Sequence, residues 1–209
     1  MADKEKSRYS ASFTAGSLLH KETSVLLPLL QSEDAEQSIR EEIKNNQILH
    51  INSESARKRI VFEVIKRIKS VDTSFWDFYA ASTEEEQKLL LFFLCLKTYP
   101  LMFDFHFNVT LKQWNSSSQA VDSYYYQMEI EEIGTRDEFV AEWTEMTKKK
   151  AVGVYLRILQ DIKLRNNQNQ LQAIDMQDDF WHFFVSCREV WFLEACLLSN
   201  ERKERLMQL

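Results

Sequence analysis

The stretch Asn52–Lys69, NSESARKRIVFEVIKRIK, predicts the helix around which we interpret the rest of the chain. Asn52 or Ser53 can serve as its N-cap, because a short polar side chain accepts hydrogen bonds from the free N–H groups of a first turn. Apolar residues then recur at the i, i+3, i+4 spacing of one helical face: Ile60, Val61, Val64, Ile65 and Ile68. We expect this face to pack against the core.

The other side of the same helix is cationic. Only Glu54 and Glu63 oppose the basic residues that fall largely outside the apolar face, which are Arg57, Lys58, Arg59, Lys66, Arg67 and Lys69. An amphipathic helix turns its charged side away from the core. The cationic side is therefore expected to face water or a polyanion.

A shorter helix is predicted immediately before the basic one. Residues 35–46, AEQSIREEIKNN, have a helical pattern, and residues 47–51 read as a tight connection. The resulting order of helix, turn and basic helix is that of a helix-turn-helix. Most charged helical faces are simply solvated, so this order alone is weak evidence for nucleic-acid binding.

The pattern occurs a second time. Ser53 and the run 57–59 align with Thr144 and the run 148–150, and the apolar register of the two helices follows. Two such helices in one register strengthen the case for a polyanion-binding surface. We expect both helices to present it on one side, with Ser53, Ser55, Arg57, Lys58, Arg59, Lys66, Thr147, Lys148, Lys149, Lys150, Arg157 and Arg165 as the nucleic-acid-binding residues.

Glycine and proline are scarce, with three Gly and two Pro in 209 residues. Strands joined by tight turns would need more of both, whereas abundant Leu, Glu, Lys and Gln favour helix. The composition therefore predicts an all-α, compact helical protein. The repeated basic pattern adds two helix-turn-helix-like units to this prediction. Residues 165–176 are polar with a short alternating patch, which fits either a small β wing or a plain loop.

The Ser-rich segment 115–119 is the best candidate for a boundary. It divides the chain into an N-terminal half, residues 1–114, and a C-terminal half, residues 115–209, although the halves can also form one continuous core. Phe180–Leu198 predicts one long buried helix, because its central charges argue against a membrane span. Glu201–Leu209 reads as a charged tail.

The net charge of −6 excludes a globally basic nucleic-acid coat, so a polyanion must be bound by a local patch. Cys95, Cys187 and Cys196 show neither CxxC nor Cys/His ligand spacing. We interpret them as reduced core residues of a cytoplasmic protein. The first residues contain no apolar signal segment, and we expect no association with a membrane.

No catalytic constellation is evident in the sequence. The four histidines are scattered, and there is no GxSxG, no glycine-rich phosphate loop and no HExxH. We therefore expect no enzymatic activity, no metal site, no cofactor and no small-molecule substrate.

Several segments carry a resemblance to a known family: FTAGSLLHKET (13–23), NSESARKRI (52–60), LLLFFLCLKTYPLMFDF (89–105) and TKKKAVGVYLRILQDIKL (147–164). Over nearly the whole chain they resemble the BrxA family of bacteriophage-exclusion (BREX) systems. The resemblance implies a small, helical, NusB-like protein that binds DNA and is not an enzyme. It also implies a role for the basic first turns, at Ser55, Arg57, Lys58 and Arg59 and at Thr147, Lys148, Lys149 and Lys150.

Together these observations predict a non-enzymatic component of a phage-defence system that binds double-stranded DNA. Lysines and arginines would neutralise phosphates, which gives low sequence specificity and a steep salt dependence. Gly153 lies inside the second basic helix, where glycine is a poor helix former. It costs about 1 kcal/mol of helix stability relative to Ala unless close packing requires a glycine at this position. Two alternatives remain: RNA binding, in line with a NusB-like fold, and an adaptor that docks on acidic patches of other BREX proteins.

Overall fold

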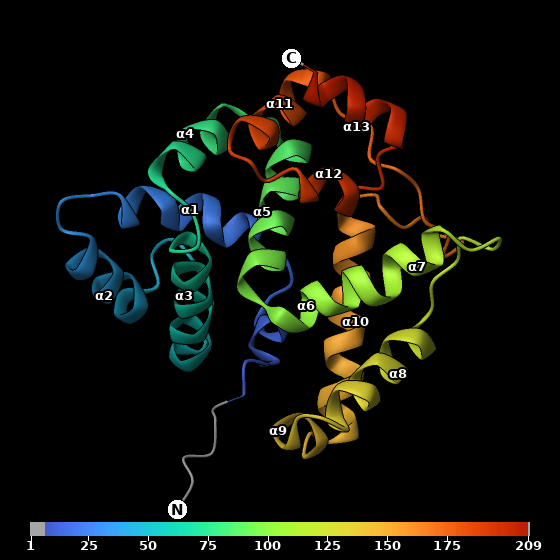
Figure 1. The fold of residues 1–209 in the computed structure, drawn as a ribbon. Helices are drawn as coiled ribbons and strands as arrows, with labels where there is room; N and C mark the ends of the chain where they lie inside the picture. Colours follow the sequence, from blue (N-terminus) through green and yellow to red (C-terminus); the bar gives the residue numbers. More distant parts are fainter. Residues whose placement is uncertain (1–6, 209) are drawn as a thin grey trace, which may run out of the picture. The chain divides into compact units, whose positions relative to one another are not determined.

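The computed structural model describes residues 7–208. Residues 1–6 and 209 lie outside this range. The prediction that the first residues contain no signal segment therefore falls partly outside the described residues. Within the described range the regular elements are helices joined by turns and loops, and no strand occurs (Figure 1). The predicted all-α fold is confirmed.

By their internal contacts, the described residues form two compact units. Ser12–Thr98, called the α1–α5 unit below, contains η1 (Ser12–Ala15), α1 (His20–Leu30), α2 (Ala35–Asn45), α3 (Glu54–Ile68), α4 (Thr73–Ala81) and α5 (Glu84–Thr98). The α6–α13 unit joins the described residues before Ser12 to those from Tyr99 onward. It contains α6 (Pro100–Asp104), the π-helix η2 (Phe105–Thr110), α7 (Leu111–Trp114), α8 (Ser123–Gly134), α9 (Glu138–Ala141), α10 (Glu145–Asp161), α11 (Asp178–Ser186), α12 (Trp191–Ala195) and α13 (Asn200–Met207). The segment 115–119, where we predicted a boundary, lies inside this second unit.

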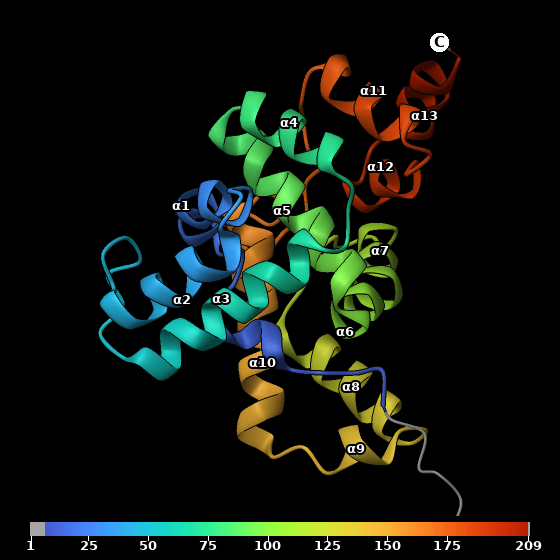
Figure 2. The ribbon, with the colours of Figure 1, turned by 90° about the vertical axis from the view of Figure 1, so that its left-hand side faces the viewer.

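Helix α5 packs against α1, α3 and α4 within its unit (Figures 1 and 2). Thr83 and Glu86 form a capping box at its start, in which the Thr83 N–H donates to the Glu86 carboxylate at 2.8 Å and the Glu86 N–H donates to the Thr83 hydroxyl at 3.4 Å. Every residue from Leu89 to Leu96 is buried, so this part of α5 is enclosed by the protein on all sides. Within residues 7–208 no single helix has the length and apolar character to cross a bilayer.

Helix α3 packs its predicted apolar face into the core of the α1–α5 unit. Val61 and Val64 are buried in one cluster with Leu26 of α1 and Ile39 of α2. The spacing of apolar residues along the helix therefore identified the buried side correctly.

Arg67 is an exception to the predicted cationic side of α3, because it is only 1% exposed. Its guanidinium donates to the carbonyl oxygens of Leu18 and Ser17 at 2.7 and 2.9 Å. Ser17 and Leu19 have left-handed backbone conformations, with φ of 55° and 56°, so the chain turns tightly between η1 and α1. Arg67 stabilises this turn by satisfying carbonyl groups that a helix would have paired internally.

A buried polar network holds the α6–α13 unit together. Nε2 of His106 donates to the carbonyl oxygen of Ala195 at 2.7 Å, so in the neutral ring Nδ1 accepts from the hydroxyl of Tyr155 at 2.8 Å. Oγ1 of Thr110 lies 2.9 Å from the hydroxyl oxygens of both Tyr155 and Tyr126. Because these four side chains are fully buried, the network fixes η2 relative to α8, α10 and α12.

The prediction of one long helix over Phe180–Leu198 is wrong. Helix α11 ends at Ser186 and α12 begins at Trp191. Between them Arg188 adopts a left-handed conformation with φ of 59°, and Cys187, which we expected in the core, is exposed. The break keeps charged residues in water that a continuous buried helix would have desolvated.

The predicted charged tail is also folded. Ser199 caps α13 by accepting a hydrogen bond from the N–H of Arg202 at 3.3 Å, and Leu206 is buried. The guanidinium of Arg202 pairs with Asp178 at the start of α11, at 3.1 Å. Helix α13 therefore packs against α11, which secures the described part of the C-terminal segment.

Residues 165–176 form a loop. One isolated antiparallel bridge joins Arg165 to Leu171, and another joins Ala120 to Gln170. A two-stranded wing would need a ladder of such pairs along both arms. Of the two predicted possibilities, the segment is closer to the plain loop.

Candidate nucleic-acid interface

The connection between α2 and α3 is built around Glu42, which is 4% exposed. Its carboxylate accepts hydrogen bonds from the N–H groups of residues 47–49 at 2.8 to 3.1 Å. Asn46 ends α2 with a left-handed φ of 54°, and its Oδ1 accepts from the N–H of Ile51 at 2.8 Å. The predicted tight connection between α2 and α3 is confirmed (Figure 2). The N–H groups of residues 47–49 and 51 are satisfied by the side chains of Glu42 and Asn46.

Arg57 lies in the first turns of α3 and is buried, with 5% of its surface exposed. It was predicted on the cationic side, but its guanidinium donates to the carbonyl oxygens of Ile43 at 2.6 Å, Lys44 at 3.4 Å and Ile51 at 2.6 Å. The last carbonyl groups of a helix lack internal donors and carry the negative end of its dipole, so a cation stabilises them. Arg57 thus fastens α3 to the end of α2, and its donors are used within the fold.

The first turn of α3 presents hydroxyl groups to solvent. Ser53 is the N-cap and accepts from the N–H of Ala56 at 3.4 Å, in agreement with the prediction. Its hydroxyl oxygen lies 2.8 Å from that of the exposed Ser55. Lys58 is also exposed and pairs with Glu54 at 2.6 Å. Surface pairs of this kind are weak, so Lys58 can exchange Glu54 for a phosphate at little cost.

Arg59 is exposed and makes no hydrogen bond or ion pair within residues 7–208. Lys66, two turns further along, is half-buried. Of the basic residues predicted on α3 as nucleic-acid contacts, Arg59 is therefore the most available.

Phe62 is a further candidate for nucleic-acid contact, which the pattern of basic residues does not include. It is 65% exposed and lies one turn from Lys58, Arg59 and Lys66 on the same side of α3. The signal was its position outside the apolar face of the helix, where a phenylalanine has no core to fill.

The second basic helix, α10, begins like the first. Thr144 is its N-cap and accepts from the N–H of Thr147 at 3.2 Å. The half-buried Thr147 keeps its hydroxyl oxygen 3.0 Å from that of Thr144. The helix predicted before Thr144 is only a single turn, α9, capped by the carboxylate of Asp137. The repeated N-cap is confirmed, whereas the preceding helix is much shorter than α2.

Lys148 aligns with Arg57 and is likewise buried, with 8% exposed. Its ammonium nitrogen lies 2.6 Å from Oε1 of Glu131 on α8 and 3.4 Å from Oε1 of Glu145. The hydrogen bond to Glu131 raises the pKa of Lys148 above its ordinary value. In both basic helices, therefore, the fourth residue after the N-cap joins the helix to its own unit.

The exposed side of α10 carries Lys149, Lys150 and Arg157, which make no hydrogen bond or ion pair in the part of the chain that the structure describes. Gly153 is exposed between them, and a Cβ atom there would meet nothing within 4 Å. Close packing within the chain is therefore not the reason for this glycine. Arg165, beyond the helix, is half-buried and donates to Oδ1 of Asn169.

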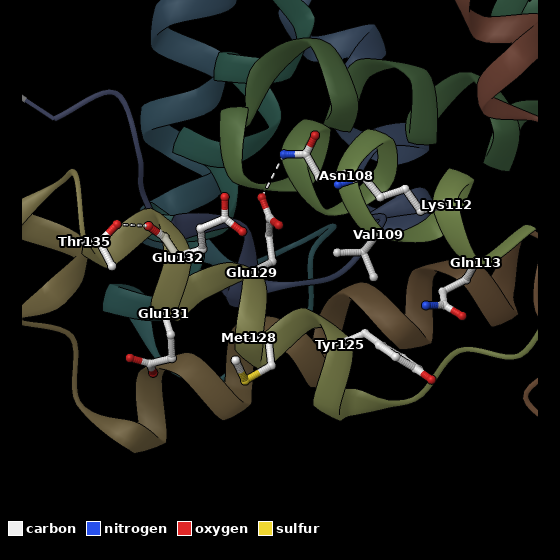
Figure 3. A pocket seen from close by; sticks show the side chains of 10 residues that line it. All are labelled: Asn108, Val109, Lys112, Gln113, Tyr125, Met128, Glu129, Glu131, Glu132 and Thr135. Carbon is white, nitrogen blue, oxygen red and sulfur yellow. Dashed lines mark hydrogen bonds between the residues drawn. The ribbon is translucent and has the colours of Figure 1, made fainter. Parts of the chain in front are cut away.

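A shallow groove of about 470 Å³ lies between η2, α7 and α8 (Figure 3). Among the lining residues, Nδ2 of Asn108 donates to Oε1 of Glu129 at 2.7 Å. The neighbouring side chains of Tyr125 and Met128 are exposed. The groove joins apolar surface to carboxylates but brings together no nucleophile, base and orienting group of the kind that hydrolases use.

Comparison with known proteins places this chain in a family. The BrxA family model matches residues 7–186. A BREX protein BrxA of Bacillus cereus (strain H3081.97) is 25% identical over 167 residues, which cover 80% of this chain and 84% of that protein. A BREX protein BrxA of Escherichia coli O9:H4 (strain HS) is 31% identical over 90 residues, covering 43% of this chain and 42% of that one.

A solved structure is similar over most of its length. The crystal structure of an uncharacterized protein from Magnetospirillum magneticum superposes with a TM-score of 0.77 and 19% identity, covering 92% of this chain and 99% of that one. This likeness shows that the two chains share a fold. By the match of its sequence to the family model, the chain belongs to the BrxA family.

Proposed function

We propose that this protein is a non-enzymatic component of a BREX phage-defence system that binds double-stranded DNA through α3 and α10, mainly at phosphates and with low sequence specificity. The observation that carries the proposal is that both helices combine a cation bonded within the fold with cations exposed to solvent. One cation near each N-terminus, Arg57 or Lys148, is bonded within the fold. The cations that follow it, Arg59 in α3 and Lys149 and Lys150 in α10, remain exposed and unpaired within residues 7–208.

Exposed, unpaired cations are suited to phosphate contact, because they lose no internal partner when they bind. Each one that neutralises a DNA phosphate releases condensed counterions, which favours binding at low salt. The hydroxyl of Ser55 and the free N–H groups of each first turn can add hydrogen bonds to phosphate oxygens. The net charge of −6 limits binding to these local patches.

The test is direct binding of a fluorescently labelled duplex to the purified protein at low and at physiological salt. We expect binding at low salt that weakens strongly as salt rises, and similar affinities for duplexes of unrelated sequence. Competition with unlabelled duplex and with structured RNA distinguishes DNA from RNA binding. The proposal would be refuted if the protein did not bind the duplex even at low salt. It would also be refuted if only RNA, and not unlabelled duplex, displaced the labelled duplex.

An adaptor role remains the second candidate, because α8 exposes apolar side chains to solvent. Tyr124, Tyr125 and Met128 are 62%, 38% and 51% exposed. Aromatic residues and methionine are enriched where proteins bind one another, so other BREX proteins are the proposed partners of this surface. Co-purification with each of these proteins in turn, compared between the wild type and Tyr124→Ala, tests this role separately from DNA binding.

A further inference from the structure

The side of α3 that faces solvent combines charge with one large apolar group. Lys58 and Arg59 precede Phe62 by one helical turn, and Lys66 follows it by one turn. Lys69 continues the same side and is exposed. Phe62 is therefore a large exposed apolar group among several cations on this side of α3.

Packing of the core does not require a phenylalanine at position 62. The apolar side of α3 already fills the core cluster through Val61 and Val64. Phe62 keeps 65% of its surface in water, so it contributes little to stability by burial. A function that needs the exposed ring in the bound state accounts for it better than packing does.

Duplex DNA exposes apolar groups to a bound protein in its grooves, which the phosphate backbones border. The thymine C5-methyl group lies in the major groove and is contacted by apolar side chains. In the helix, turn, helix order of α2 and α3, the second helix is the one that enters this groove in helix-turn-helix proteins. Cations on both sides of Phe62 would then reach the phosphates that border the groove.

We propose that Phe62 contacts thymine methyl groups when α3 lies in the major groove, and so gives this protein a preference for thymine-containing sites. The inference rests on the proposed DNA binding and adds to it a direct contact with bases. It accounts for an aromatic residue among these cations, where phosphate binding alone would favour a further lysine or arginine.

Two short duplexes of identical sequence test this contact, one with thymine and one with deoxyuridine, which lacks only the methyl group. We expect the wild type to bind the thymine duplex about threefold to tenfold more tightly. Phe62→Ala should bind both duplexes equally, close to the wild-type affinity for the deoxyuridine duplex. Because Phe62 is exposed, an unchanged thermal unfolding temperature is expected to show that the variant is folded.

Phe139→Ala is the matched control, because Phe139 is 51% exposed but lies beside Glu138 and Glu142. It should keep the wild-type preference. A wild type that binds both duplexes equally, or a Phe62→Ala variant that retains the preference or weakens both complexes alike, would overturn the inference and leave DNA binding intact. A wild type that binds neither duplex would overturn the proposed function itself.

Discussion

Nε of Arg57 donates to the carbonyl oxygen of Ile43 at 2.6 Å, which joins the start of α3 to the end of α2. The same guanidinium reaches the carbonyl oxygen of Ile51 in the connection, also at 2.6 Å. A buried arginine that satisfies several carbonyl groups is costly to remove, because its partners are left without donors. We predict that Arg57→Ala lowers the free energy of unfolding by about 2 to 3 kcal/mol, measured by urea denaturation.

Arg59→Ala is the control for this prediction, since Arg59 lies on the same helix and has no partner within residues 7–208. It should change the free energy of unfolding by less than about 0.5 kcal/mol and weaken DNA binding. Equal stability of the two variants would show that Arg57 does not fasten the helices together.

His106 makes the stability of the protein sensitive to acid. Burial lowers its pKa to about 4, while its hydrogen bond to Ala195 opposes this shift in part. In the unfolded chain the pKa is about 6.5, so below that pH the unfolded state binds a proton that the folded state does not. The contribution to stability is therefore complete above pH 6.5 and falls as the pH is lowered to 4, by about 3 kcal/mol in total.

Urea denaturation between pH 7 and pH 4 measures this dependence, and His106→Gln isolates the histidine. The amide of glutamine can still donate to Ala195 but does not titrate. The variant should be less stable at pH 7 and lose less stability between pH 6.5 and pH 4 than the wild type does. Parallel pH profiles for the two proteins would rule out His106 as the source.

Gly153 is predicted to be replaceable without structural cost. Its added Cβ atom would lie in open space, and it occupies the interior of an exposed helical face. Alanine restricts the unfolded chain and favours helix, so Gly153→Ala should stabilise the protein by about 0.5 to 1 kcal/mol. A thermal unfolding temperature that is unchanged or lower in the variant would contradict this.

Lys148 is predicted to contribute to folding more than to DNA binding. Lys148→Ala removes its bond to Glu131 on α8 and should lower the free energy of unfolding by about 1 kcal/mol, a modest value because Glu131 is half exposed. The salt dependence of DNA binding should change little. A lower salt dependence with unchanged urea denaturation would place Lys148 among the phosphate-binding residues instead.

Local signals explain what could be predicted from the sequence. Helix N-caps depend on residues a few positions apart, so Ser53 and, by its alignment with Ser53, Thr144 were recognisable. The apolar spacing likewise identified the buried face of α3, because one helix alone determines which residues share a side.

The burial of basic residues could not be predicted in this way. Arg57, Arg67 and Lys148 all carry a charge that periodicity assigns to solvent, yet each is bonded to groups supplied by another segment. Those groups are mainly backbone carbonyls. Because every residue has one, the sequence does not indicate which carbonyl groups will accept a hydrogen bond from a buried arginine. The break at Arg188 was missed as well, because an arginine does not by itself signal the left-handed conformation that it adopts there.

DNA binding by exposed cations is tested most directly by the slope of log affinity against log salt. Lys149→Ala/Lys150→Ala should weaken binding to unrelated duplexes by similar factors and reduce the slope by about 0.9 for each phosphate that the variant no longer neutralises. Lys112→Ala, which removes an exposed lysine from outside the basic helices, should leave affinity and slope unchanged. A double variant with the wild-type slope would contradict the proposed interface on α10.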